Sequence, residues 1–151
     1  MRLTTKSQYG LKVLGLLVRN YYDGSNNYVQ VGNLAAECKT SQKYLEQVLV
    51  PLSRAGLLES KRGQHGGYRL NRPPKGVSLA EVLRHLEGLL MPIPQWADDT
   101  DDGLPVGAVL RRVRESIRLI LEETSIEVLA ENADGTVEKT DNTVKELMYY
   151  I

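Results

Sequence analysis

The chain has 151 residues, 42% hydrophobic and 25% charged, so it can bury a core as one small domain, or as a small domain with an oligomerisation arm. No stretch approaches the ~20 apolar residues that cross a bilayer, and the N-terminus lacks the apolar run of a signal peptide. The single cysteine, Cys38, excludes an intramolecular disulfide framework and is typical of a reducing cytoplasm.

The net charge of zero hides an uneven distribution along the chain. Residues 1–75 contain 12 Lys and Arg against 4 Asp and Glu, a net charge of +8. Residues 76–151 contain 7 Lys and Arg against 15 Asp and Glu, a net charge of −8. A basic half joined to an acidic half is typical of a polyanion-binding module linked to a region that does not bind. A chance segregation of solvated charges is equally compatible, so the motifs must decide.

The spacing of apolar residues predicts three helices in the first third of the chain, over residues 5–21, 31–38 and 41–55. Ser41 can cap the third helix by accepting a hydrogen bond from a free backbone N–H. Pro51 lies inside that helix and is expected to remove one internal hydrogen bond or to kink the last turn. Gly56 stands where a left-handed residue commonly ends a helix.

After Gly56 the periodicity becomes that of strands. Two strands, residues 57–62 and 68–71, are predicted around a basic, glycine-rich turn, which makes a hairpin. Ser78 can cap a short helix that runs to about residue 87. Three prolines and four aspartates predict an exposed loop over residues 91–105.

The C-terminal part of the chain is predicted to be helical. A long amphipathic helix is expected from about residue 105 to 123, and a short one from Thr124 or Ser125 to about residue 131. Residues 144–151 are expected to form a last helical turn or a frayed tail. The apolar stripe of the long helix has no obvious partner within so small a domain, so we expect it to pair with a second copy of the chain. The residues predicted to be buried in this homodimer are Val109, Val113, Ile117 and Ile120.

Helix, short helix, turn, helix and basic hairpin is the order of a winged helix-turn-helix, in which the third helix enters the major groove of DNA. The N-terminal residues of that helix reach base edges: glutamine can read adenine, lysine guanine, and glutamate the cytosine amine. The residues predicted to meet DNA from this helix are Ser41, Gln42, Lys43, Tyr44 and Glu46.

The hairpin is predicted to straddle the DNA backbone. Lys61, Arg62 and Arg69 supply its cations, and Arg62 at the tip can enter a minor groove. The small residues Gly63, Gly66 and Gly67 are expected to let the tip approach the phosphates closely.

Four blocks of sequence resemble consecutive blocks of the Rrf2 family of bacterial winged helix-turn-helix regulators, the IscR-, NsrR- and CymR-like proteins. The blocks are MRLTTKSQYGLKVLGLL, KYLEQVLVPLSRAGLLES, KRGQHGGYRL and VSLAEVLRHLEG. The resemblance covers about residues 1–88, and the combination of YLEQ with RG-x-x-GGY is highly specific. It implies a winged-helix domain and a long helix that dimerises and cradles the partner's domain. For recognition it implies Ser41, Lys43, Tyr44 and Glu46 in the third helix and Arg62 in the wing.

The sequence departs from the family where an iron–sulfur cluster would bind. Cluster-bearing members carry three cysteines in the loop before the dimer helix, and residues 91–105 contain neither cysteine nor histidine. Another cluster mode of the family uses an acidic residue and a histidine in the first helix, where this chain has Gln8 and Lys12. Because thiolates hold such clusters, the resemblance implies the cluster-free branch of the family.

The sequence therefore predicts a mainly α protein without metal or cofactor. A winged helix-turn-helix domain is expected over residues 1–88, an acidic loop over 89–104, and a dimerisation helix with a C-terminal helical segment over 105–151. The predicted function is that of a cytoplasmic DNA-binding transcriptional regulator, a repressor that binds double-stranded DNA at a near-palindromic operator as a homodimer. No membrane contact is expected, and no nucleophile–base pair indicates an enzyme.

Two alternatives and the signal stay open at this point. The winged helix could instead bind another protein, or Cys38 could sense oxidants, although an inward helix cysteine usually packs as a small apolar residue. A small-molecule or protein effector is expected near the 91–105 loop.

Overall fold

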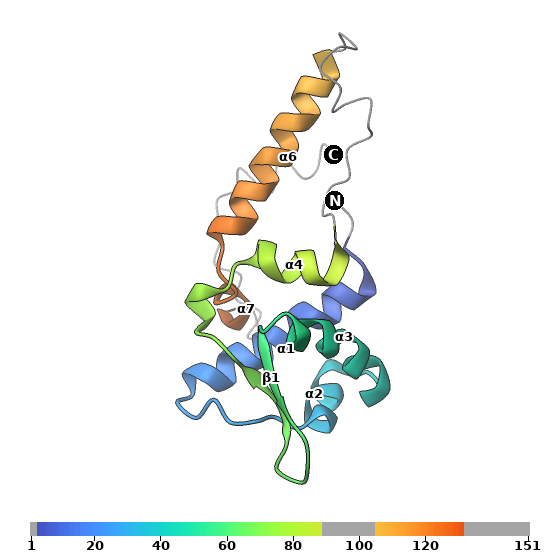
Figure 1. The fold of residues 1–151 in the computed structure, drawn as a ribbon, viewed down its shortest axis with the longest axis vertical. Helices are drawn as coiled ribbons and strands as arrows, with labels where there is room; N and C mark the ends of the chain where they lie inside the picture. Colours follow the sequence, from blue (N-terminus) through green and yellow to red (C-terminus); the bar gives the residue numbers. More distant parts are fainter. Residues whose placement is uncertain (1–2, 89–104, 132–151) are drawn as a thin grey trace.

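The computed structural model describes residues 3–88 and 105–131 (Figure 1). The predicted acidic loop over 89–104 and the predicted helical turn over 144–151 lie outside the described residues. Within the described part, the predicted order of three helices, a hairpin, a short helix and a long helix is confirmed. The elements are α1 Thr5–Tyr22, α2 Val31–Cys38, α3 Gln42–Arg54, β1 Leu58–Lys61, β2 Gly67–Leu70, a 3-10 turn Pro74–Gly76, α4 Leu79–Glu87, α6 Pro105–Glu123 and α7 Val128–Glu131.

Three of the helices begin at a hydroxyl cap. A side-chain oxygen accepts a hydrogen bond from the backbone N–H three residues further on, which satisfies one of the donors that a helix start leaves free. This confirms the caps predicted at Ser41 and Ser78. The capping pairs are Thr4 with Ser7, Ser41 with Tyr44, and Ser78 with Glu81.

The end of α3 forms a left-handed cap at Gly56, as predicted. Gly56 has a φ of +73°, and the N–H groups of Gly56 and Leu57 donate to the carbonyls of Ser53 and Leu52, both at 3.0 Å. These two bonds form a Schellman motif, which turns the chain directly into β1. Pro51 lies inside α3 and has no backbone N–H, so one carbonyl of the helix lacks its helical donor.

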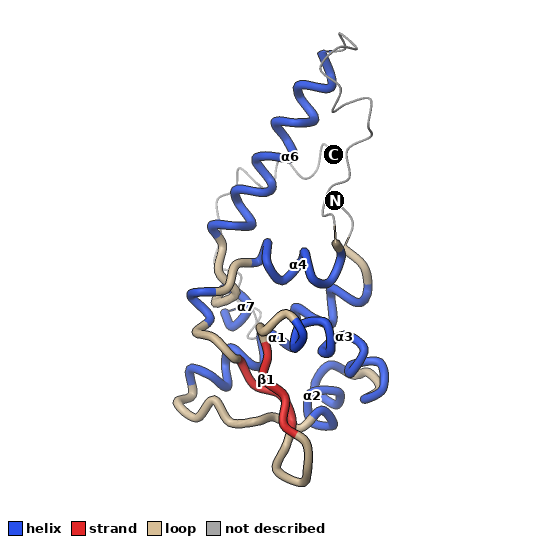
Figure 2. The backbone as a smooth tube through the Cα atoms, viewed as in Figure 1, coloured by secondary structure: helices blue, strands red, loops and turns tan. Residues whose placement is uncertain are grey.

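The wing consists of β1, β2 and the turn between them, which projects from the bottom of the molecule in Figure 2. The strands are antiparallel, with Leu58 opposite Leu70 and Lys61 opposite Gly67. A third segment adds to this sheet, because Val29 exchanges two backbone hydrogen bonds of 2.9 Å with Tyr68. The connection between α1 and α2 is therefore fixed to the wing.

One hydrophobic core joins α1, α3, the wing and α4. Leu14, Leu17, Leu49 and Leu52 have no exposed surface, and Ile126, which follows α6, is equally buried in the same core. No helix in residues 3–88 and 105–131 is both long and apolar enough to span a bilayer.

The segment after α6 differs from its prediction. Thr124 and Ser125 do not start a helix: the Thr124 carbonyl accepts from Leu79 at 2.8 Å, and Ile126 N–H donates to the Val77 carbonyl at 2.9 Å. This bridge holds the chain extended, so α7 begins only at Val128. α7 packs on α1, while α6 extends away from the winged helix (Figure 1).

We expect Ser41→Ala to lower the free energy of unfolding by about 1 kcal/mol, since it removes the acceptor that caps α3. Denaturant titration of the full chain measures this loss. Ser60→Ala is the matched control, because Ser60 is exposed on β1 away from any helix start. Equal losses in the two variants would show that the cap does not stabilise α3.

Candidate nucleic-acid interface

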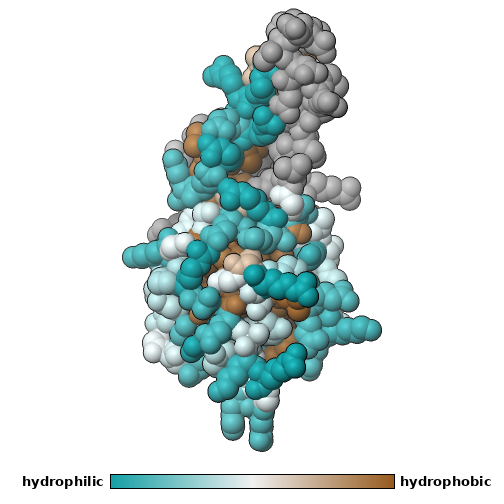
Figure 3. All heavy atoms as spheres, in the orientation of Figure 1, coloured by the Kyte–Doolittle hydropathy of each residue, from teal (hydrophilic) through white to brown (hydrophobic). Residues whose placement is uncertain are grey.

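A groove separates α3 from the wing. We call it the reading groove. One side comes from α3, the other from the wing, and residues 30–32 at the start of α2 complete it. Its lining residues are Gln30, Val31, Gly32, Gln42, Glu46, Val50, Ser60, Lys61, Arg62, Gly63, Gln64, Gly66, Gly67 and Tyr68. The surface of the projecting wing is hydrophilic (Figure 3). Four of the predicted DNA contacts, Gln42, Glu46, Lys61 and Arg62, therefore lie together.

The α3 residues divide into those that line the reading groove and those that do not. Gln42 and Glu46 are one helical turn apart and line it. The Gln42 side chain lies over Gly32, where an added Cβ would come within 2.9 Å of its Nε2 atom. The small residue in α2 therefore makes room for the glutamine at the start of α3.

The other three predicted α3 contacts lie outside the groove lining. Ser41 uses its hydroxyl to cap α3, and Lys43 is exposed. Tyr44 is half-buried, with its ring packed edge-to-face on Tyr9 at 5.5 Å between centroids. DNA contacts by these three residues stay predictions.

Arg69 is held by other residues of the wing. Its Nε and Nη2 atoms donate to Glu59 Oε2 at 2.9 and 2.7 Å, and its guanidinium lies 4.5 Å from the centre of the Tyr28 ring. The Tyr28 hydroxyl also donates to Glu59, and with Arg69 it lowers the pKa of that carboxyl below its ordinary value. Lys61 lies over the same ring at 5.6 Å. Arg69 thus stiffens the wing, and its predicted contact with DNA stays untested.

Sequence reasoning missed two glutamines of the reading groove. Gln30 precedes α2, and its Nε2 atom donates to the carbonyl of Gln64 in the wing turn at 2.8 Å. The bond ties the tip of the wing to the helix-turn-helix. Glutamines in loops carry no local signal of such a partner, so only the folded arrangement reveals the pair.

The long helix α6 exposes apolar side chains. Val109 is 55% exposed, Val113 40% and Ile120 62%. Together with Ile117 they line a shallow groove along one side of α6, which also includes Arg112 and Ser116. The predicted dimerisation residues therefore share one face, and brown atoms are visible along α6 in Figure 3.

The fold and the reading groove define a winged helix-turn-helix protein of the kind that regulates transcription. The sequence profile of the Rrf2 family, described as "Iron-dependent Transcriptional regulator", matches residues 3–132. The chain belongs to this family: it is a DNA-binding transcriptional regulator and not an enzyme.

Individual relatives agree with this assignment. The HTH-type transcriptional regulator CymR of Bacillus subtilis (strain 168) is 31% identical over 138 residues, which cover 91% of this chain and 96% of the relative. A solved structure described as CymR (YrzC), the global cysteine regulator of B. subtilis, has a TM-score of 0.74 at 30% identity and covers 89% of this chain and 99% of that one. A structure described as T. potens IscR has a TM-score of 0.70 at 26% identity, and the match covers 99% of this chain and 97% of that one.

The family description names iron, but the residues of this chain do not fit the iron–sulfur cluster that the resemblance implies for cluster-bearing members. Cys38, the sole cysteine, is 5% exposed in the core, and burial raises its pKa, which disfavours the thiolate that such clusters need. His65 is exposed in the wing turn and His85 on α4. Among residues 3–88 and 105–131, no three Cys, His, Asp or Glu side chains gather closely enough to hold a metal ion.

Proposed function

We propose that this regulator is a cluster-free repressor that binds a near-palindromic operator as a homodimer in the cytoplasm. Residues 1–88 read the DNA, and α6, within the segment 105–151, joins the two copies. The observation that carries the proposal is the reading groove, because it places the predicted base-reading side chains of α3 beside the predicted cations of the wing.

The charges of the reading groove support selective DNA binding. Lys61 and Arg62 are exposed cations on one side, and phosphates attract them whatever the sequence. Glu46 on the other side repels phosphates unless it finds a donor such as the cytosine amine. A carboxylate in this position therefore favours particular bases, whereas the wing supplies affinity.

The exposed face of α6 supports the homodimer. In a two-fold interface each residue is used twice, so burial of these valines and isoleucines stabilises the pair from both sides. The cluster-free state is supported by the single buried cysteine. The same burial makes the core role of Cys38 better supported than oxidant sensing.

Selection from random-sequence DNA tests the proposal. The full chain should enrich a near-palindrome whose half-site centres lie roughly 34–36 Å apart. DNA upstream of cysteine-metabolism genes is the first natural fragment to compare, given the description of the CymR relative. No enrichment even at low salt would instead favour a winged helix that binds another protein.

Variants separate base reading from attraction to phosphate. Glu46→Ala should relax the preference at one position in each half-site. Arg62→Ala should weaken binding by about 1–3 kcal/mol if the guanidinium reads a base. If it meets phosphate alone, the loss should be uniform across sequences with a shallower salt dependence.

Arg54→Ala is the matched control, because Arg54 is an exposed cation at the end of α3 that does not line the reading groove. It should leave the base preference unchanged. If Glu46→Ala and Arg62→Ala both behave like this control, α3 and the wing do not read the DNA.

A further inference from the structure

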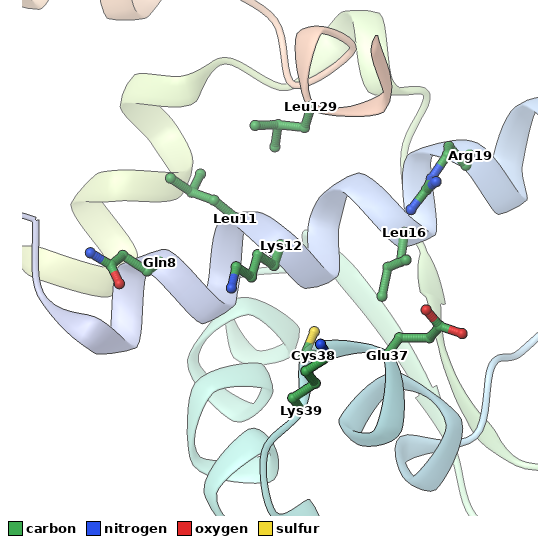
Figure 4. A pocket seen from close by; sticks show the side chains of 9 residues that line it. All are labelled: Gln8, Leu11, Lys12, Leu16, Arg19, Glu37, Cys38, Lys39 and Leu129. Carbon is green, nitrogen blue, oxygen red and sulfur yellow. The ribbon is translucent and has the colours of Figure 1, made fainter. Parts of the chain in front are cut away.

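A second cavity lies between α1, α2 and α7, apart from the reading groove (Figure 4). Its volume of about 480 Å³ falls in the range typical of small-molecule sites. Gln8, Lys12, Leu16 and Arg19 recur every three to four residues on one face of α1, and with Leu11 they form one wall. The cavity therefore lies on a side of α1 that α7 and the end of α2 cover only in part.

The opposite wall comes from the end of α2. Glu37 and Lys39 line it, Cys38 lies at its base, and Leu129 of α7 forms the remaining side. Figure 4 shows the Lys39 side chain directed toward α1, and the Lys12 and Arg19 side chains at separate points along α1. Residues from three elements thus converge on one space.

The charge of this cavity is not balanced. Lys12, Arg19 and Lys39 line it with a single carboxylate, Glu37, and none of the three cations has an ion pair within residues 3–88 and 105–131. Other arginines in the same part of the chain do pair with glutamates: Arg69, Arg72, Arg84 and Arg118. Three exposed cations against one carboxylate give the cavity a net positive charge, which attracts an anion.

The apolar side chains narrow the chemistry of that anion. Leu11, Leu16 and Leu129 are half-buried at the cavity wall. An inorganic ion would neutralise the cations and leave these leucines in water. A ligand with an apolar body would cover them as well and so gain the free energy of their burial.

We propose that this cavity binds a small organic carboxylate with a short apolar body. The carboxylate is attracted by the cations that line the cavity, and the body packs on the leucines of α1 and α7. The backbone of Lys39 is in accord with this role, because a lysine occupies a position that glycine or asparagine usually takes. Lys39 ends α2 in the left-handed conformation, with a φ of +54°.

The position of the cavity connects it to the DNA-binding machinery. Lys39 begins the short turn that leads to the Ser41 cap of α3. Leu129 belongs to the segment that the Ser125 bridge fixes after α6. A ligand that contacts both would favour one placement of α3 relative to α6 and so change operator affinity, provided it binds that placement more tightly. This regulatory step rests on the proposed DNA-binding function.

The test compares carboxylates with neutral molecules of the same shape. Benzoate and 3-methylbutanoate are titrated into the full chain, without DNA, beside benzamide and 3-methylbutanamide, and backbone amide shifts are followed by NMR. We expect the carboxylates to shift the residues that line the cavity and to bind at least about tenfold more tightly than the amides. Inorganic phosphate should shift these residues only weakly.

Charge removal gives the second arm. Arg19→Gln combined with Lys39→Gln should weaken benzoate binding at least about tenfold. The control combines Arg54→Gln with Lys75→Gln, which removes two exposed cations from outside the cavity and should leave benzoate binding unchanged.

Three results would each overturn the site: no carboxylate binding at about 10 mM, equal binding by the amides or phosphate, or equal affinity in the two double variants. Operator binding is measured separately with and without benzoate. Carboxylate binding by a chain that ignores DNA would leave the site standing and refute the proposed function. Operator binding that benzoate leaves unchanged would refute the regulatory step alone.

Discussion

Ile120→Glu is expected to turn the proposed homodimer into a monomer at micromolar concentration. Ile120 is 62% exposed in the single chain and lines the apolar groove of α6. Because a two-fold interface uses each residue twice, the change removes two buried side chains, each worth about 1.5–3 kcal/mol. It also brings two carboxylates into an apolar interface, so the dimer should weaken at least about a thousandfold.

Sedimentation velocity measures this change, and operator affinity should fall with it because one half-site alone then binds. Leu119→Glu is the matched control: it makes the same change one residue earlier, at a leucine that is 43% exposed but does not line the groove. The control should stay dimeric. A dimeric Ile120→Glu variant, or a monomeric wild type, would show that this face of α6 does not join two copies.

The elements that sequence predicted well are those with local signals. Ser41 and Ser78 act within one helical turn, and the φ of Gly56 belongs to the residue itself. Such signals depend on neighbours in the chain, so they are present before tertiary contacts are known.

The segment after α6 depends on a distant partner. Ile126 pairs with Val77 across 49 residues, and neither residue carries a pattern that names the other. Alternation and helical spacing describe one element at a time, so the extended bridge was predicted as the start of a helix.

Only part of the reading groove was predicted, because local patterns do not name partners in distant segments of the chain. Gln42, Glu46, Lys61 and Arg62 follow from their places on a recognition helix and a hairpin tip. The pairing of Glu59 with Arg69 was available in principle, because the register of the hairpin places them opposite each other. Tyr28 and Gln30 were not predictable, since they come from a loop whose position only the folded wing defines.

Two glycines of the wing have a structural cause besides the predicted approach to phosphates, which stays a prediction. Gly67 has a φ of +140°, and a Cβ there would lie 2.1 Å from the Val29 carbonyl oxygen. A Cβ on Gly66 would lie 2.1 Å from the Lys61 carbonyl oxygen. Both glycines are therefore needed by backbone packing inside the protein. Gly63, with open space around it, is the one that leaves room outside the wing.

Gly67→Ala is accordingly expected to destabilise the fold by about 3 kcal/mol. The unfavourable backbone accounts for about 1–3 kcal/mol of this loss, and displacement of Val29 from the wing accounts for a similar amount. For a chain of this size the melting temperature should fall by about 10 °C. Thermal and denaturant unfolding of the full chain measure both quantities.

Three more alanine variants separate the two causes. Gly63→Ala meets a φ of +103° but no neighbouring atom, and Gly66→Ala meets the Lys61 carbonyl without a left-handed backbone, so each should cost less than Gly67→Ala. Gly76→Ala meets neither a left-handed backbone nor a neighbouring atom. It should be neutral, or should stabilise the fold by about a few tenths of a kcal/mol, because alanine lowers the conformational entropy of the unfolded chain. If Gly67→Ala is as mild as Gly76→Ala, Val29 does not lie against the wing, and the link between the α1–α2 connection and the hairpin is absent in solution.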